Sequence, residues 1–102
     1  MEDLFKTALQ FYADGFYHEA RQAFSELLKA YPQHSEIWLN LGNAEFQLDA
    51  LPNAEKSWHM AIEKNPLEAK AYLNLGNLYF KQERYKKALG YWEQYLLLVL
   101  II

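Results

Sequence analysis

The sequence contains no cysteine, so disulfide bonds and thiolate metal sites are excluded. This absence fits a reducing compartment, and the acidic start Met1-Glu2-Asp3 lacks the basic and apolar regions of a secretory signal. We therefore expect a cytoplasmic protein. Glycine and proline are also scarce, at four and three residues, and no Gly/Ser-rich or Pro-rich segment divides the chain. The chain is therefore expected to fold as a single domain over residues 1–102.

An excess of positive charge is missing as well. The net charge is −3, and the nearest approach to a basic patch is the group Lys81, Arg84, Lys86 and Lys87. Four cations around one helical turn are typical of a solvated edge, whereas nucleic-acid-binding domains usually have a pI above about 9. The composition therefore argues against nucleic acid as a partner.

The motifs of catalysis are absent. None of the histidines His18, His34 and His59 has a second histidine or a carboxylate at a repeated metal-ligand spacing. No serine lies in a Gly-x-Ser-x-Gly context, and no glycine-rich phosphate loop occurs. The sequence therefore predicts no enzyme, no cofactor and no metal site.

What the sequence does contain is an internal repeat. Residues 38–43 read WLNLGN and residues 72–77 read YLNLGN. The same spacing relates two further sets of residues, the alanines Ala20, Ala54 and Ala88 and the aromatic residues Phe24, Trp58 and Trp92. A fixed period of this size, about 34 residues, indicates stacked supersecondary units that share one core.

Each unit has the pattern of two helices. Apolar residues recur at helical spacing from residue 4 to 12 and again from 17 to 28, with the turn signal Asp14-Gly15 between them. Later helices are predicted at residues 35–48, 51–64, 69–82 and 85–99. Pro32 and Pro66 should end the helices before them, whereas Pro52 fits a first turn. Ser35 is predicted to cap the next helix.

Small residues inside the helices indicate close packing. Gly42 and Gly76 lie in the middle of predicted helices, where glycine costs roughly 1 kcal/mol relative to alanine. Tight contact between paired helices would compensate for that cost. Trp58 and Trp92 are expected to pack between hairpins.

The repeat resembles a known family. The spacing of the tetratricopeptide repeat is matched by Trp38, Leu41, Gly42, Ala54, Trp58 and Pro66. The counterparts in the third unit match as well, except at its end, where Leu100 replaces the expected proline. The first unit is weaker, because Leu4, Thr7 and Ala8 replace the preferred Trp, Leu and Gly. The resemblance implies an all-α protein, a right-handed α-solenoid of three antiparallel helical hairpins. Its repeats would cover residues 1–34, 35–68 and 69–102.

The resemblance also places a candidate binding surface, because the first helix of each unit lines the concave face in this family. Carried onto this chain, that groove comprises Phe5, Leu9, Tyr12, Leu39, Asn40, Asn43, Phe46, Leu73, Asn74, Asn77 and Phe80. Apolar rows supply burial, and asparagine amides pair with a bound backbone. The groove thus fits a peptide or helix with apolar side chains. The alternatives are that the asparagines bond neighbouring repeats and that the aromatic residues pack within them.

Some members of the family hold the acidic tail of cytosolic chaperones in a clamp of lysine, arginine and asparagine. In this chain Phe5 and Leu9 replace the first Lys and Asn of that clamp, and Asn74 stands in place of its Arg. Only Asn40 and Lys70 match. The resemblance therefore argues against capture of a carboxylate tail.

The last eight residues, Tyr95 to Ile102, form an apolar run. Such a run is unusual at the end of a solenoid, because solenoids normally end with a polar capping helix. The run is too short for the roughly 20 residues that span a bilayer, which argues against a membrane-bound chain. Three explanations remain open: cover by a further helix of a longer protein, the start of a membrane anchor in such a parent, or cover by another copy. We favour a homo-oligomer, preferably a dimer, associating through Leu97, Leu98, Val99, Leu100, Ile101 and Ile102.

The sequence thus predicts a non-catalytic module that binds a protein or peptide partner with apolar side chains in its concave groove. The alternative is a self-assembling structural unit that associates through its apolar C-terminal end.

Overall fold

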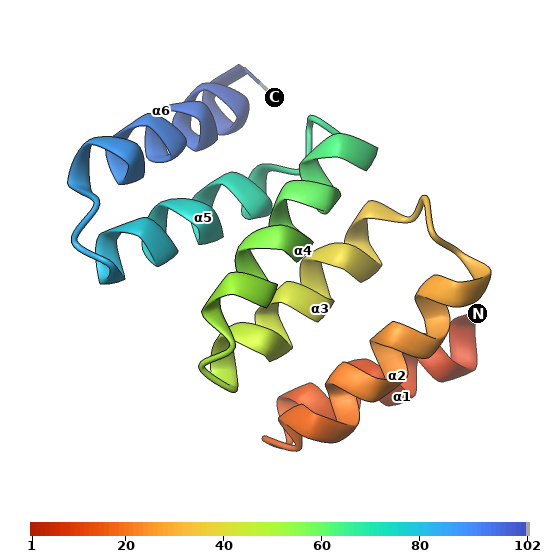
Figure 1. The fold of residues 1–102 in the computed structure, drawn as a ribbon. Coiled ribbons are helices and arrows are strands. Elements are labelled where there is room, and N and C mark those ends of the chain that lie inside the picture. The colour runs from red at the N-terminus through yellow and green to blue at the C-terminus, as the bar shows by residue number, and fades with distance from the viewer. Residues whose placement is uncertain (102) are drawn as a thin grey trace.

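The computed structural model describes residues 1–101, over which the chain forms six helices and no strand (Figure 1). The helices are α1 (Glu2–Ala13), α2 (Tyr17–Ala30), α3 (Ser35–Gln47), α4 (Leu51–Lys64), α5 (Ala69–Lys81) and α6 (Tyr85–Ile101). The predicted helices are all present. The third and fifth end one residue earlier than expected, and α6 continues two residues further.

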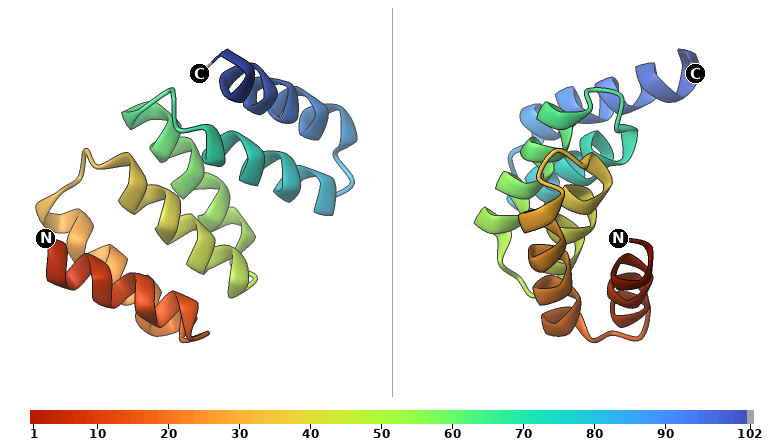
Figure 2. Two further views of the ribbon diagram at one scale, coloured as in Figure 1. Left: turned by 180° about the vertical axis from the view of Figure 1, so that it is seen from behind. Right: turned by 90° about the vertical axis from the view of Figure 1, so that its right-hand side faces the viewer.

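The helices form three antiparallel hairpins stacked in one direction (Figure 2). Within hairpins, α1 packs on α2, α3 on α4 and α5 on α6, and α2 contacts α3 as α4 contacts α5 between hairpins. The second helix of each of the first two hairpins therefore joins it to the next one. The prediction of an all-α solenoid is confirmed.

The turn inside each hairpin has the same geometry. Gly15, Asp49 and Glu83, which hold equivalent positions in the three repeats, all have a positive φ, at 83°, 60° and 60°. Each follows a helix whose end is closed by a Schellman-type backbone bond, from Phe16 N to Phe11 O in the first hairpin and between the equivalent atoms in the other two. Two acidic residues thus occupy a conformation that glycine favours.

The loops between hairpins also repeat. Both prolines predicted to end helices lie two residues after α2 and α4, and Pro52 lies in the first turn of α4. Trp38 Nε1 donates to Pro32 O at 2.9 Å, and Tyr72 Oη donates to Pro66 O at 3.0 Å. The predicted cap at Ser35 is wrong. The cap position of α3 belongs to His34, and Ser35 Oγ instead donates to Glu68 at 3.2 Å.

The mid-helix glycines mark close approaches between paired helices. A Cβ added at Gly42 would lie 2.5 Å from Trp58 Cδ1, and a Cβ at Gly76 would collide with the ring of Trp92. Trp58 is buried, at 2% exposure, as predicted. Trp92 is only half-buried, because it lies in the last hairpin and not between two hairpins. That part of the prediction is corrected.

Candidate functional site

The predicted groove residues line several hollows along the first helices of the hairpins. A cavity of about 180 Å³ lies among Tyr12, Asn43, Phe46, Gln47, Trp58, Asn74 and Asn77. A second, of about 490 Å³, includes Leu9, Leu39, Asn40 and Asn43 together with Glu36, Glu68, Ala69 and Lys70. Leu73 and Asn77 line a third hollow of about 410 Å³ with Trp92, Tyr95 and Leu96. The structure thus brings nine of the eleven predicted residues to these hollows.

The other two predicted groove residues, Phe5 and Phe80, line none of these hollows and pack against neighbouring aromatic rings. Phe5 is half-buried, with its ring 6.3 Å from that of Phe24 and 6.3 Å from the imidazole of His34. Phe80 is 53% exposed and packs on Trp92, with ring centroids 5.5 Å apart. Among the residues that do line a hollow, Leu39 is only 4% exposed, so it belongs mainly to the core.

The groove asparagines make intramolecular hydrogen bonds. Asn74 Nδ2 donates to Asn43 Oδ1 at 2.8 Å, and this bond joins the second and third hairpins. The same Asn43 oxygen accepts from Trp58 Nε1 at 3.2 Å, and Asn77 Oδ1 accepts from Trp92 Nε1 at 3.1 Å. Asn40 Nδ2 bonds to Glu36 O of its own helix at 2.9 Å. Asn43 and Asn77 thus accept hydrogen bonds within the fold, and Asn40 and Asn74 donate them.

Two aromatic residues of the groove, Tyr12 and Phe46, pack against the second helices of their hairpins. The ring of Tyr12 lies 5.3 Å from that of Tyr17, and the ring of Phe46 lies 5.6 Å from that of Trp58. Burial raises the pKa of the Tyr12 phenol, with a smaller opposing effect from a hydrogen bond to Gln47. These contacts within hairpins fix the rings as a wall of the groove.

The group Lys81, Arg84, Lys86 and Lys87 was predicted to be a solvated edge. Three of these cations lie over aromatic rings. Lys81 Nζ lies 5.1 Å from the centre of the Phe46 ring and 3.7 Å from Asp49 Oδ1. Arg84 and Lys87 lie 4.8 Å and 4.6 Å from the centre of the Tyr79 ring. Such contacts stabilise by about 0.5–1 kcal/mol at exposed sites.

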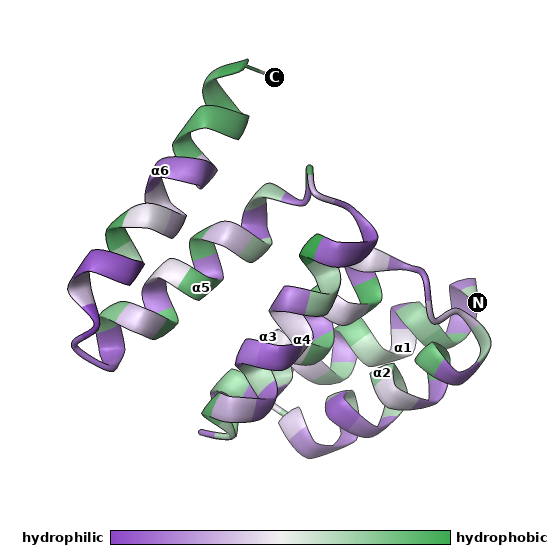
Figure 3. Ribbon diagram, turned by 45° about the horizontal axis from the view of Figure 1, so that its top comes forward, coloured by the Kyte–Doolittle hydropathy of each residue, from purple (hydrophilic) through white to green (hydrophobic). Residues whose placement is uncertain are grey.

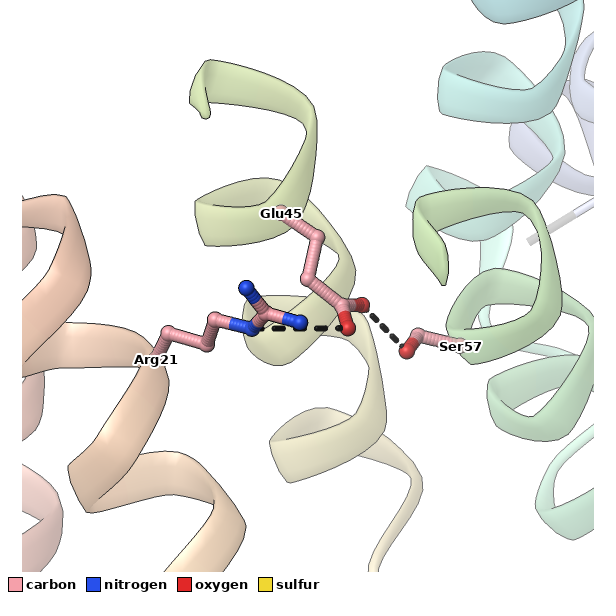
Figure 4. Close-up of polar contacts among 3 residues, drawn as sticks. All are labelled: Arg21, Glu45 and Ser57. Carbon is pink, nitrogen blue, oxygen red and sulfur yellow. Dashed lines mark hydrogen bonds and ion pairs between the residues drawn. The ribbon is translucent and has the colours of Figure 1, made fainter. Parts of the chain in front are cut away.

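The sequence analysis did not identify the buried carboxylate of Glu45, which lies at the junction of the first two hairpins. Glu45 is 5% exposed and accepts a hydrogen bond of 2.5 Å from Ser57 Oγ, while Arg21 Nε lies 3.9 Å from its other oxygen (Figure 4). Burial raises the pKa of the Glu45 carboxyl, and the Ser57 bond and Arg21 oppose that change. The signal was available, because Glu45 occupies the repeat position of Phe11 and Tyr79.

At the junction of the second and third hairpins, Tyr79 takes the repeat position of Glu45. Tyr79 Oη donates a hydrogen bond of 2.6 Å to Glu55 Oε2 and lies 3.1 Å from His59 Nε2. Burial and the nearby Glu55 carboxylate raise the pKa of Tyr79, and burial lowers the pKa of His59. Among residues 1–101 no group of histidine and acidic side chains has the arrangement of a metal site.

The predicted self-association segment lies on α6. Its last turns are apolar (Figure 3), and the exposed large side chains include Leu97 at 52%, Val99 at 45%, Leu100 at 80% and Ile101 at 79%. Leu98 is half-buried, and Ile102 lies outside the described residues. Within the described part of the chain, no helix is both long and apolar enough to cross a bilayer.

A stack of helical hairpins with a groove along its first helices defines the class of α-solenoid repeat proteins. The chain belongs to the tetratricopeptide repeat family, whose sequence pattern matches residues 5–58 and 51–97. This membership supports a protein-interaction module. A comparison with curated proteins finds no match.

Solved structures share the fold over nearly the whole chain. MamA is 25% identical with a TM-score of 0.90, and the alignment covers 95% of this chain but 57% of the MamA chain. The first TPR of Spaghetti (RPAP3), bound to the HSP90 peptide SRMEEVD, is also 25% identical, with a TM-score of 0.89 and coverage of 93% and 75%. The Yersinia enterocolitica translocator chaperone SycD, in its alternative dimer, is 18% identical with a TM-score of 0.94 and coverage of 96% and 74%.

Proposed function

We propose that residues 1–102 act as one non-catalytic domain that binds a peptide or helix with apolar side chains in the concave groove. The observation that carries this proposal is the cavity where Tyr12 and Phe46 stand beside Asn43, Asn74 and Asn77. Aromatic walls bury apolar side chains, and amide groups pair with a peptide backbone. The lack of cysteine is the basis for proposing that this occurs in the cytoplasm.

The peptide complex of the Spaghetti domain supports a peptide as the ligand, but the chemistry of this chain differs from that of an anion clamp. In this chain Phe5 and Leu9 occupy the positions where the family's clamp has its first lysine and asparagine, and Leu9 lines the second hollow. Lys70 lies there with Glu36 and Glu68, so this hollow contains two carboxylates and one ammonium group. We therefore propose an apolar, weakly charged segment as the ligand.

Selection from a displayed library of short random peptides tests the groove. Peptides enriched on the wild type should carry apolar residues at regular spacing. They should bind at least about tenfold more weakly to the double variant Asn40→Ala, Leu73→Ala, because both residues line hollows and a typical groove contact contributes about 1–2 kcal/mol. The matched control is Gln22→Ala with Lys56→Ala, two exposed positions on the second helices. Equal binding by both double variants, or selection of acidic tails, would refute the proposal.

The second candidate is self-assembly through α6. The observation that favours it is the row of exposed apolar side chains at the end of the stack, since monomers rarely expose a contiguous apolar patch. Light scattering across a hundredfold dilution tests it. A mass above one chain that falls on dilution supports self-assembly, and a mass of one chain throughout refutes it.

A further inference from the structure

The outer face of α6 is the counterpart of a face that α2 and α4 cover with the next hairpin. Leu28 in α2 is 9% exposed, and Ile62, at the same repeat position in α4, packs against the core that α4 shares with α5. Leu96 holds this position in the third repeat and is 52% exposed. The face that the next hairpin covers on α2 and on α4 is thus exposed on α6.

The covered faces of α2 and α4 each make a polar contact with the next hairpin. Arg21 of α2 reaches Glu45 of α3, and Glu55 of α4 accepts a hydrogen bond from Tyr79 of α5. Arg21 and Glu55 hold the same repeat position, as do their two partners. Leu89 holds the position of Arg21 and Glu55 on α6 and is 56% exposed. The face of α6 therefore has an exposed apolar side chain where the other two faces have a charged one.

The opposite end of the stack does not match this face. In α3 the side chains buried against the first hairpin's core include Ile37, Leu41 and Ala44. The equivalent residues of α1 are Asp3, Thr7 and Gln10, and all three are exposed. Thr7 Oγ1 bonds to Asp3 O, and Gln10 Nε2 bonds to Asp14 Oδ1. A second copy docked head to tail would therefore press polar side chains onto an apolar face.

We propose instead that two copies pair through α6 about a two-fold axis, with the two helices antiparallel. This inference rests on the self-assembly candidate above and specifies its geometry. The apolar row of α6 consists of Leu89, Trp92, Leu96 and Val99, in which steps of three and four positions alternate. That spacing is the seam of a helix pair. A two-fold pairing covers both rows and closes, whereas head-to-tail stacking continues into fibres.

Charge at the two ends of α6 favours the antiparallel direction. Lys86 and Lys87 lie in its first turn, which has no acidic residue, and the last turn has no basic residue. Cations are unfavourable at the N-terminus of a helix and favourable at the C-terminus. In an antiparallel pair Lys86 lies at the same end as the C-terminus of the other copy's helix, whereas Lys87 lies on the Tyr79 ring of its own chain. Reversing the apolar row onto itself then sets Leu89 of one copy opposite Val99 of the other.

Sedimentation and light scattering of matched charge variants test the pairing. Leu96→Glu should raise the dimer dissociation constant at least about tenfold, because it places an unpaired charge in the apolar seam. Thr7→Glu puts the same charge on the outer face of α1 and should leave the mass of the dimer unchanged. A mass of one chain for the wild type, or disruption by Thr7→Glu, would overturn the proposal.

Disulfide cross-linking tests the geometry of the pair. Because the chain has no cysteine of its own, only the introduced cysteines can react. A mixture of Leu89→Cys and Val99→Cys chains should oxidise to a covalent dimer faster than either variant alone or a mixture of Thr7→Cys and Leu96→Cys. Preferential cross-linking of the Thr7→Cys mixture would overturn the two-fold pairing while leaving self-assembly intact. Peptide binding is measured on a Leu89→Glu chain, because Leu89 lies on the proposed seam but lines none of the groove hollows, so the result for the groove is independent of both outcomes.

Discussion

Asn74 of α5 donates a hydrogen bond of 2.8 Å to Oδ1 of Asn43 in α3. Both residues line the groove cavity, and the bond also ties the third hairpin to the second. The groove wall and the junction between hairpins are therefore built from the same side chains. Substitutions in the groove have to be separated into those that affect binding alone and those that also affect stability.

The two related asparagines Asn40 and Asn74 should differ in stability when each is replaced by alanine. Asn74→Ala should lower the free energy of unfolding by about 1 kcal/mol, because it removes the bond between hairpins. Asn40→Ala should change it by less than about 0.5 kcal/mol, because Asn40 bonds only within its own helix in the described structure. Urea unfolding measures both, and a larger cost at Asn40 would contradict the assignment.

Glycine-to-alanine substitutions should have opposite signs at two positions. At Gly42 the new methyl group would meet the Trp58 ring, and overpacking of this kind costs about 1–3 kcal/mol. At Gly90, in α6, no atom outside the adjacent residues and the local helix backbone lies within 4 Å of the added Cβ. There alanine should stabilise by about 0.5–1 kcal/mol through its helix propensity. Thermal unfolding of the two variants is the measurement, and equal signs would show that the close approach at Gly42 is wrong.

The tryptophans at equivalent repeat positions should contribute unequally. Trp58→Ala should cost about 3–5 kcal/mol, since the side chain is 2% exposed and also donates to Leu39 O at 3.1 Å. Trp92→Ala should cost less, because that ring is only half-buried. Guanidinium unfolding of both variants compares them. A cost below about 1 kcal/mol for Trp58→Ala would refute the helix pairing described above.

The buried Glu45 makes stability depend on pH in an unusual direction. Because the pKa of Glu45 is raised in the folded state, that state binds its proton more readily than the unfolded chain does. The contribution of Glu45 to stability therefore increases as pH falls through the raised folded pKa toward the ordinary value of 4.5. Above that window the folded state carries the cost of a buried charge.

Replacing Glu45 by glutamine tests this effect. The glutamine amide would keep an acceptor for Ser57 and remove the charge, so Glu45→Gln should be more stable than the wild type at pH 7. The difference should shrink as pH falls toward 4.5, and Glu26→Gln at an exposed site serves as the control. Unfolding across this pH range measures the difference. A less stable Glu45→Gln at pH 7 would show that the Arg21 contact outweighs the burial.

Much of the fold could be predicted from sequence, because each helix is set by local signals. Helical periodicity, the Asp14-Gly15 turn and the prolines after α2 and α4 are properties of short segments. Ser35 was assigned wrongly because the preceding His34 takes the cap position, and the serine hydroxyl donates to Glu68, which directly precedes α5. A contact of that range leaves no local signal. The predicted ligand role of the groove residues and the division into three repeats stay predictions.

The sequence by itself determined the period of the repeat, the six helices, and the small residues at Gly42 and Gly76 that let paired helices meet. Only the tertiary structure decided how equivalent positions differ. Leu28 and Leu96 stand at the same place in the repeat, yet one is 9% and the other 52% exposed. The physical reason is that burial depends on the neighbouring hairpin, which covers α2 and is absent from the described chain beyond α6.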